Sequence, residues 1–194
     1  MGRNIAGTKT KNVKPNWFGK HFKKASSRSQ NREIKKATKK AKENPLTASD
    51  LSKCLSRVPN FLGIFPSDQV PLIRFIERPI FIIVNIEITG EAGSHWIALR
   101  LGKSKLEIFD SLGFHPRLWS SYPLKFIDWL KNLSLTHRIF VSQLTQEQNT
   151  FICGLYCVFF ILYRQFLRFC DCCAKFGSDY ELNSIKLDSL LLNF

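Results

Sequence analysis

One stretch of the chain, Gln146 to Leu162, restricts the possible folds more than any other. Its sequence is QEQNTFICGLYCVFFIL, in which a polar segment leads to Cys153 and then to large apolar residues. Apolar residues recur at helical spacing, which predicts a helix buried in the core: Leu155, Val158, Phe159 and Leu162. The apolar run is too short for the roughly 20 residues that a membrane span requires.

Cys153 is expected in the first turn of this helix. The first N–H groups of a helix have no intrahelical partner and form its positive end, so a thiolate, the nucleophilic form of cysteine, is favoured there. Asn149 and Thr150 are expected to cap the helix, and Gly154 to leave room for an extended substrate. Cys157 lies one turn further in. The alternative is that both cysteines are small core residues.

Two short segments, His95–Leu101 and Lys105–Asp110, are predicted to form a β-hairpin. A two-residue turn at Gly102 and Lys103 would place His95 directly opposite Asp110. A four-residue turn would instead place these two residues diagonally on the same face and would separate the like charges of Arg100 and Lys105. Either register brings an imidazole and an orienting carboxylate together. His21, His115 and His137 have no such partner in the sequence.

The remaining patterns place further elements around this hairpin. Thr47 or Ser49 can cap a short helix that ends at Leu55. Residues 60–71 are predicted to be a loop with aromatic anchors, and β-branched residues predict a strand over 79–89. An amphipathic helix is predicted over 124–133, a strand over 137–144, and a loop with a weakly amphipathic end from residue 170 onward. This order predicts an α+β fold with the Cys153 helix packed on the sheet.

The positive charge of the chain is concentrated in its first 45 residues. They hold fourteen Lys or Arg against two Glu, a net charge of +12 out of +14 for the whole chain. We therefore expect two regions: a disordered basic arm over 1–45, and a folded domain over 46–194. The arm is expected to contact nucleic acid or to act as a nuclear-import signal, and 32–43 could become helical once its charges are neutralised. The expected nucleic-acid contacts are Lys20, Lys23, Lys24, Lys35, Lys36, Lys39 and Lys40.

The six cysteines are expected to be reduced thiols, because no secretory signal is evident at the start of the sequence. Cys170, Cys172 and Cys173 lack a second ligand pair at zinc spacing, so no metal site is predicted. A soluble, intracellular and monomeric protein without membrane contact is expected.

Three motifs, in this order and at this spacing, resemble the adenovirus-type cysteine endopeptidases, including those of Maverick/Polinton-like elements and adintoviruses. They are His95-Trp96-Ile97-Ala98-Leu99, Ile108-Phe109-Asp110-Ser111-Leu112-Gly113-Phe114, and Cys153-Gly154-Leu155-Tyr156-Cys157. Phe61-Leu62-Gly63 also looks like the segment upstream of the family's histidine. More distantly, the same order resembles the deSUMOylating proteases. The resemblance covers residues 58–165 and implies a papain-like protease core with an antiparallel-rich central sheet.

The resemblance implies a role for each matched position. Cys153 matches the nucleophile, His95 the general base, and Asp110 the acid that orients the imidazole. Gln146 matches the side chain that donates to the oxyanion, together with the backbone N–H of Cys153. Gln148 is the second choice for that role.

The resemblance also implies a function. We expect an endopeptidase of a virus or virus-derived element that cleaves capsid or core precursor proteins, in the virion and host nucleus. No cofactor is expected to be required, although the family's use of DNA makes DNA a candidate stimulating polyanion. The alternatives are an isopeptidase that removes SUMO or ubiquitin, and an inactive nucleic-acid-binding scaffold.

Overall fold

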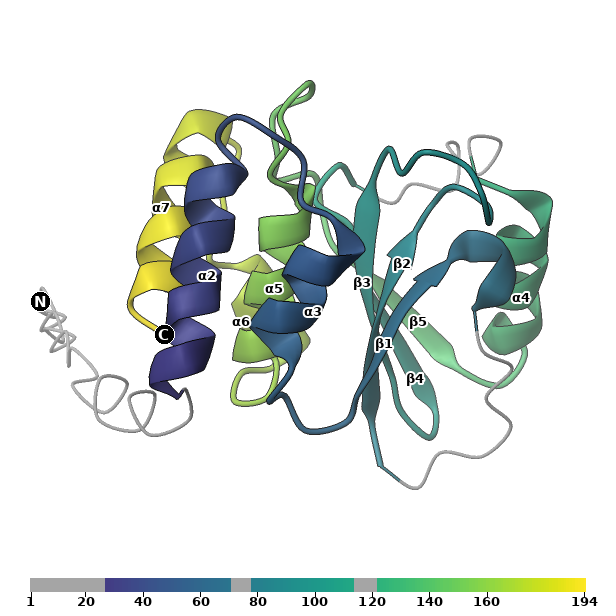
Figure 1. Ribbon diagram of the computed structural model, residues 1–194. Helices are drawn as coiled ribbons and strands as arrows, with labels where there is room; N and C mark the ends of the chain where they lie inside the picture. The colour runs from purple at the N-terminus through teal and green to yellow at the C-terminus, as the bar shows by residue number, and fades with distance from the viewer. Residues whose placement is uncertain (1–26, 71–77, 114–121) are drawn as a thin grey trace, which may run out of the picture.

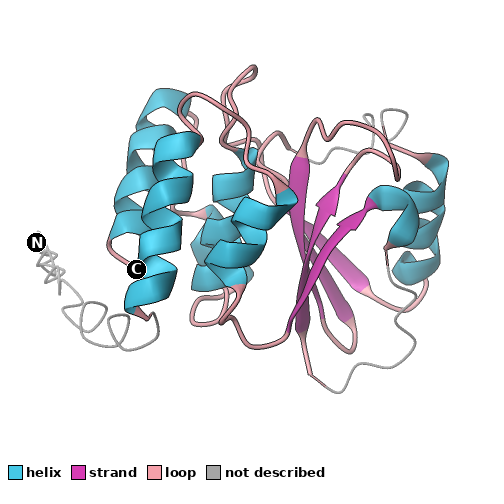
Figure 2. Cartoon of the chain, in the orientation of Figure 1, coloured by secondary structure: helices cyan, strands magenta, loops and turns pink. Residues whose placement is uncertain are grey.

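The fold is a five-stranded sheet with helices on both faces (Figures 1 and 2). This computed structural model describes residues 27–70, 78–113 and 122–194. The strands are β1 (Phe61–Pro66), β2 (Ile80–Asn85), β3 (Trp96–Leu101), β4 (Lys105–Phe109) and β5 (Arg138–Val141). The helices are α2 (Arg28–Lys40), α3 (Ala48–Leu55), the 3₁₀ turn η1 (Ser67–Gln69), α4 (Leu124–Ser134), α5 (Cys153–Tyr163), α6 (Phe169–Cys173) and α7 (Tyr180–Leu192).

The sheet follows the chain order β1-β2-β3-β4-β5. Its three central strands are antiparallel, whereas each edge strand pairs in parallel with its neighbour. The predicted α+β fold with the Cys153 helix packed against the sheet is confirmed, because α5 lies against β3. The sheet is mixed, since its two outer pairs are parallel.

The β3–β4 hairpin adopts the wider of the two predicted turns. Leu101 pairs with Leu106, and the N–H of Gly102 donates to the carbonyl of Lys105 at 2.9 Å. The two-residue turn is therefore wrong. The observed register places Arg100 opposite Glu107, with 3.3 Å between the guanidinium and the carboxylate, and so replaces a like-charge pair by an ion pair.

The start of the predicted loop over 60–71 is a strand. β1 pairs with β2, and its register shifts between Phe61 and Gly63, where the backbone has a φ of 142°. Phe61 and Ile64 pack against the core. The loop prediction failed because this irregular strand lacks the alternation of polar and apolar residues that identifies a strand in a sequence.

Helix α2 shows that the folded domain begins before residue 46, where the sequence analysis placed the boundary between the basic arm and the domain. Ser27 caps this helix, and Ile34 and Ala37 are buried in the core shared with α5 and α7. Gln30, also buried, donates to the carbonyl of Cys54 at 2.9 Å, which ties α2 to α3. Charge alone suggested an arm, but the few apolar residues of α2 fall on one face and pack on the domain. Residues 1–26 lie outside the described part of the chain.

Two hydrophobic clusters lie on opposite faces of the sheet. One is formed with α2, α3, α5 and α7, and the other with α4 (Figure 1). Every residue of α5 is buried. Leu187 and Leu191 of α7 belong to the first cluster. The weakly amphipathic segment predicted near the C-terminus is therefore a helix that packs on the domain. No helix in the described ranges is both long and apolar enough to cross a membrane.

Candidate active site

Cys153 is the first residue of α5 and so lies in the first turn of the helix, as the sequence predicts. The chain reaches it through a loop that leaves β5, and Ile152 is the N-cap. The predicted caps, Asn149 and Thr150, are wrong, because α5 starts too far along the chain for either to cap it. Asn149 instead has a positive φ of 66°, a turn conformation that asparagine tolerates. The first turn of α5 therefore has no side-chain cap.

Gly154 has a packing role that differs from the predicted one. A Cβ atom at this position would lie 3.1 Å from Leu51 and 3.2 Å from Leu46. These contacts would be tighter than usual, so glycine suits the close approach of α5 to α3 and to the loop before it. The structure thus gives Gly154 a helix-packing role, and the room it would leave for a substrate stays a prediction.

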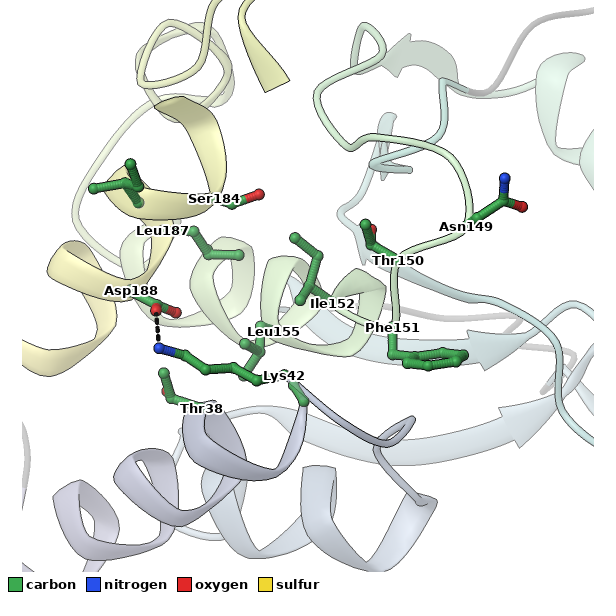
Figure 3. Close-up of a pocket in the computed structure, with 12 residues that line it drawn as sticks. Thr38, Lys42, Asn149, Thr150, Phe151, Ile152, Leu155, Ser184, Leu187 and Asp188 are labelled. Atoms are coloured by element: carbon green, nitrogen blue, oxygen red, sulfur yellow. Dashed lines mark ion pairs between the residues drawn. The ribbon is translucent and has the colours of Figure 1, made fainter. Parts of the chain in front are cut away.

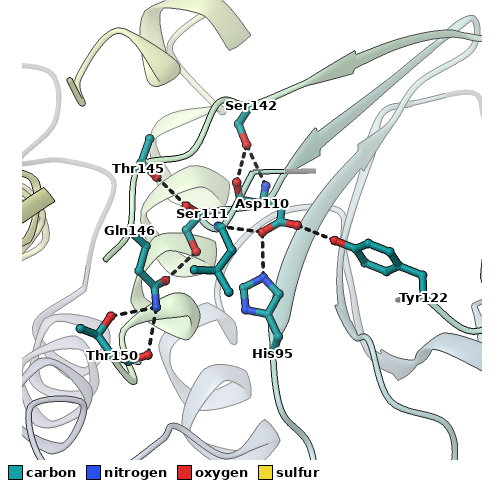
Figure 4. Close-up of polar contacts among 9 residues, drawn as sticks. His95, Asp110, Ser111, Tyr122, Ser142, Thr145, Gln146 and Thr150 are labelled. Atoms are coloured by element: carbon teal, nitrogen blue, oxygen red, sulfur yellow. Dashed lines mark hydrogen bonds and ion pairs between the residues drawn. The ribbon is translucent and has the colours of Figure 1, made fainter. Parts of the chain in front are cut away.

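His95 and Asp110 meet at one end of the sheet, as the hairpin predicts. His95 Nε2 lies 2.7 Å from Asp110 Oδ1, and both side chains are buried (Figure 4). A carboxylate only accepts, so Nε2 carries the proton and donates it. This leaves Nδ1 as the ring nitrogen that can exchange a proton with a thiol.

Three further donors hold Asp110 in place. Tyr122 Oη–H donates to Oδ2 at 2.7 Å, and the Leu112 N–H donates to Oδ1 at 2.9 Å. The hydroxyl of Ser142 bonds to both backbone groups of Asp110, at 2.7 and 2.9 Å. Burial and the charge of Asp110 raise the pKa of Tyr122 well above its ordinary range, so the phenol remains a donor. The sequence analysis missed Tyr122 and Ser142, because no motif connects them to Asp110.

The environment of His95 favours its protonated form. Burial alone would lower the pKa of the imidazole, but hydrogen bonds to Asp110 and Cys153 outweigh this effect and raise the pKa to about 9. The thiol of Cys153 is therefore the second partner of the ring. Sulfur, imidazole and carboxylate lie in series, which is the arrangement of a nucleophile, its base and an orienting group.

Cys157 does not share this environment. It is 1% exposed, and burial together with the nearby Cys153 raises its pKa well above the ordinary value. Such a thiol stays protonated and unreactive. The six cysteines in the described ranges are all free thiols.

The two candidate oxyanion donors lie in different surroundings. Gln146 is 2% exposed, and its Oε1 accepts from the Ser111 hydroxyl at 2.7 Å (Figure 4). Its Nε2 donates at 3.0 Å to both the carbonyl and the hydroxyl of Thr150. Gln148 is exposed in the loop. Gln146 therefore belongs to the polar network of the site. Both N–H groups of its Nε2 donate to Thr150, so an oxyanion could bind Nε2 only by replacing one of these two acceptors.

The lysines expected to bind nucleic acid divide into two groups. Lys35, Lys36 and Lys39 lie exposed on α2, where Lys36 pairs with Glu33 at 2.8 Å. Lys40 is less exposed and bonds to Asp50 at 2.7 Å. Lys20, Lys23 and Lys24 lie outside the described residues, as do His21 and His115. His137 is bonded through Nδ1 to the hydroxyl of Thr136 at 2.8 Å and lies outside the site.

A cavity of about 410 Å³ lies beside the loop that precedes Cys153 (Figure 3). The end of α2, the loop at 149–152 and α7 line it, and an ion pair of 3.2 Å joins Lys42 to Asp188 at its wall. His95, Asp110, Gln146 and Cys153 are not among its lining residues. Within the described ranges, no three His, Cys, Asp or Glu side chains are grouped as metal ligands.

An α+β fold in which the first cysteine of a buried helix contacts a histidine bound to a carboxylate defines the class of papain-like cysteine peptidases. The family model described as adenovirus endoprotease matches residues 61–175. The chain therefore belongs to the adenovirus endoprotease family and is by class a cysteine peptidase. The family expectation from the sequence motifs is confirmed.

Two solved protease structures show some similarity to this chain. The crystal structure of an ASFV protease is 20% identical with a TM-score of 0.37, over 56% of this chain and 43% of that one. SUMO protease Ulp1, with its catalytic cysteine oxidised to a sulfinic acid, is 15% identical with a TM-score of 0.45, over 87% of this chain and 94% of that one. The chain thus spans less than half of the ASFV protease. No curated protein sequence matches this chain.

Proposed function

We propose that this protein is a cysteine endopeptidase of a virus or virus-derived element that processes capsid or core precursor proteins. The observation that carries the proposal is the contact series Cys153, His95 and Asp110 in a chain of the adenovirus endoprotease family. The family membership supports a viral context, and the geometry supports the chemistry.

The proposed reaction forms and then hydrolyses a thioester. The thiolate of Cys153 attacks the carbonyl carbon of the scissile peptide, and a tetrahedral oxyanion forms. The protonated His95 gives its proton to the amine as the C–N bond breaks. His95 then takes a proton from water, which attacks the thioester and releases the acid. Asp110 keeps Nε2 of the imidazole protonated throughout, so that Nδ1 faces the reacting atoms.

We assign the oxyanion contacts to the N–H of Cys153 and the side chain of Gln146. The N–H lies in the uncapped first turn of α5, where it has no intrahelical acceptor. The amide of Gln146 is buried and held at its oxygen end by Ser111, which leaves its nitrogen end as the donor. Removing such a donor typically lowers the rate about 100- to 1,000-fold.

The decisive experiment is co-expression with the capsid and core precursors of the same genome. The wild-type chain should process a precursor, whereas Cys153→Ala should not. Cys170→Ala is a matched control, because Cys170 is an exposed thiol outside the site. Equal processing by wild type and Cys153→Ala would contradict the proposed mechanism.

The same chemistry would cleave an isopeptide bond, so an isopeptidase that acts on ubiquitin-like modifiers is the alternative. Release of a fluorophore from a SUMO or ubiquitin conjugate, without precursor cleavage, would favour it. An inactive nucleic-acid-binding scaffold is the second alternative. It predicts that an alkylating peptide probe does not label Cys153.

We also propose that the basic N-terminal region contacts nucleic acid in the virion or host nucleus, with DNA as a stimulating polyanion. Lys35, Lys36 and Lys39 form an exposed basic strip on α2, and cations presented in this way neutralise phosphates. Replacing all three by Gln should weaken DNA affinity and flatten its salt dependence. Unchanged affinity would remove α2 from the interface.

A further inference from the structure

Ser111 holds the segment that carries Gln146 through its backbone. The carbonyl of Ser111 accepts from the N–H of Thr145 at 2.8 Å and from the N–H of Gln146 at 2.9 Å. The carbonyl of Thr145 in turn accepts from Tyr156 and from Asn183, each at 3.0 Å. Four backbone and side-chain bonds thus fix this segment without the hydroxyl of Ser111.

The hydroxyl of Ser111 acts on the side chain of Gln146 instead. It donates to Oε1 at 2.7 Å, while the Thr150 carbonyl accepts from Nε2 at 3.0 Å (Figure 4). If the Gln146 amide were rotated by 180°, its Oε1 would face the Thr150 carbonyl oxygen. Two acceptors would then lie side by side, because a carbonyl cannot donate. Oxygen toward Ser111 and nitrogen away from it is therefore the one orientation that satisfies both neighbours.

We infer that Ser111 is a positioning residue, whose hydroxyl orients the Gln146 amide so that its N–H can reach the oxyanion. Two consecutive side chains at the end of β4 then orient both parts of the machinery: Asp110 the imidazole and Ser111 the amide. The side chain of Ser111 is buried and donates to Gln146, so its hydroxyl acts on the site through Gln146. The inference rests on the proposed role of Gln146.

The first test is steady-state cleavage of a fluorogenic peptide that carries the site mapped in the processed precursor. Ser111→Ala should lower kcat by up to about tenfold and leave KM unchanged, because one buried hydrogen bond is lost and substrate contacts are not. Ser111→Thr, which keeps the hydroxyl, should recover most of the loss. Ser134→Ala, at an exposed serine of α4, is the matched control and should cleave like wild type.

The second test is a double-mutant cycle. Gln146→Ala alone should lower kcat about 100- to 1,000-fold. If Ser111 acts through Gln146, then Ser111→Ala should cause no further loss in the Gln146→Ala background. A full second loss would show that Ser111 acts on the fold or on another group, and would overturn the inference.

Alkylation of Cys153 by iodoacetamide distinguishes orientation from damage to the nucleophile. This displacement forms no oxyanion, so its rate in Ser111→Ala should equal that of wild type. A slower rate, or an unchanged kcat in Ser111→Ala, would overturn the inference while leaving the proposed function intact. Absence of peptide and precursor cleavage by the wild-type protein would instead overturn the proposed function and the inference with it.

Discussion

The two ends of α5 are built differently. At its N-terminal end, Cys153 follows an N-cap, Ile152, that makes no side-chain bond, and Phe151 beside it is 49% exposed. At its C-terminal end, Arg164 makes two hydrogen bonds to the buried carboxylate of Glu107, at 2.7 and 2.8 Å. The body of the helix between these ends is buried throughout.

This contrast separates stability from chemistry within one helix. The bidentate ion pair fixes the far end of α5 to β4, and paired charges of this geometry are strong. The near end keeps its backbone donors free of caps, which is what an anionic thiolate and an oxyanion need. A helix held at one end and along its body can present reactive groups at the other without losing its position.

The largest expected effect is at the reactive end. Cys153→Ala should lower kcat/KM by about 10⁴-fold or more, because no other thiol contacts His95. Its unfolding midpoint in urea should stay close to that of wild type. Cys157→Ala, one turn further in, should keep its turnover. Comparable activity losses in both variants would show that Cys153 is not the nucleophile that distinguishes the N-terminal end of α5.

The next largest effect shows which glutamine donates to the oxyanion at the N-terminal end of α5. Gln146→Ala should lower kcat about 100- to 1,000-fold, because the buried amide lies in the polar network of the site. Gln148→Ala, at an exposed loop position, should show wild-type kcat. The opposite result would transfer the oxyanion role to Gln148.

At the structural end, Glu107→Ala should lower the free energy of unfolding by about 3 kcal/mol, because it leaves Arg164 largely buried without its partner. Chemical denaturation measures this loss, and turnover of the folded fraction should persist. The control is Arg168→Ala, whose ion pair with Asp171 is exposed and should matter little. Loss of turnover per folded molecule would show that the two ends are coupled.

The last expected effect is the pH dependence of stability. The pKa of His95 rises from 6.5 to about 9 on folding, so its stabilisation is fully present below pH 6.5 and is lost as pH rises through about 9. A shift of this size corresponds to about 3 kcal/mol, so wild-type stability should fall by up to that amount over this window. His95→Gln should lack this component. Parallel pH curves for both proteins would contradict the assigned His95 environment.

Sequence patterns anticipated the parts of the site that depend on local order. Alternation along a hairpin placed His95 and Asp110 on one face, and the structure joins them by a bond of 2.7 Å. The helical spacing after Cys153 identified α5 and placed Cys153 in its first turn. These inferences worked because strand and helix periodicities are fixed by backbone geometry. The catalytic roles of these residues stay predictions.

Other features had no local signal. The basic composition of α2 hid a helix that packs on the domain through Ile34 and Ala37. The close approach of α5 to Leu46 and Leu51 assigned Gly154 to packing. The bond from Ser111 to Gln146 joins residues 35 positions apart, a distance that no motif spans.

The sequence by itself determined that a cysteine lies in the first turn of a buried helix and that a histidine and an aspartate share one end of a hairpin, because short-range backbone periodicity dictates both. Only the tertiary structure decided which groups orient them: Tyr122 and Ser142 around Asp110, and Ser111 around Gln146. Such contacts depend on how separate elements pack, and directional hydrogen bonds form only where the packed backbone brings donor and acceptor within about 3 Å.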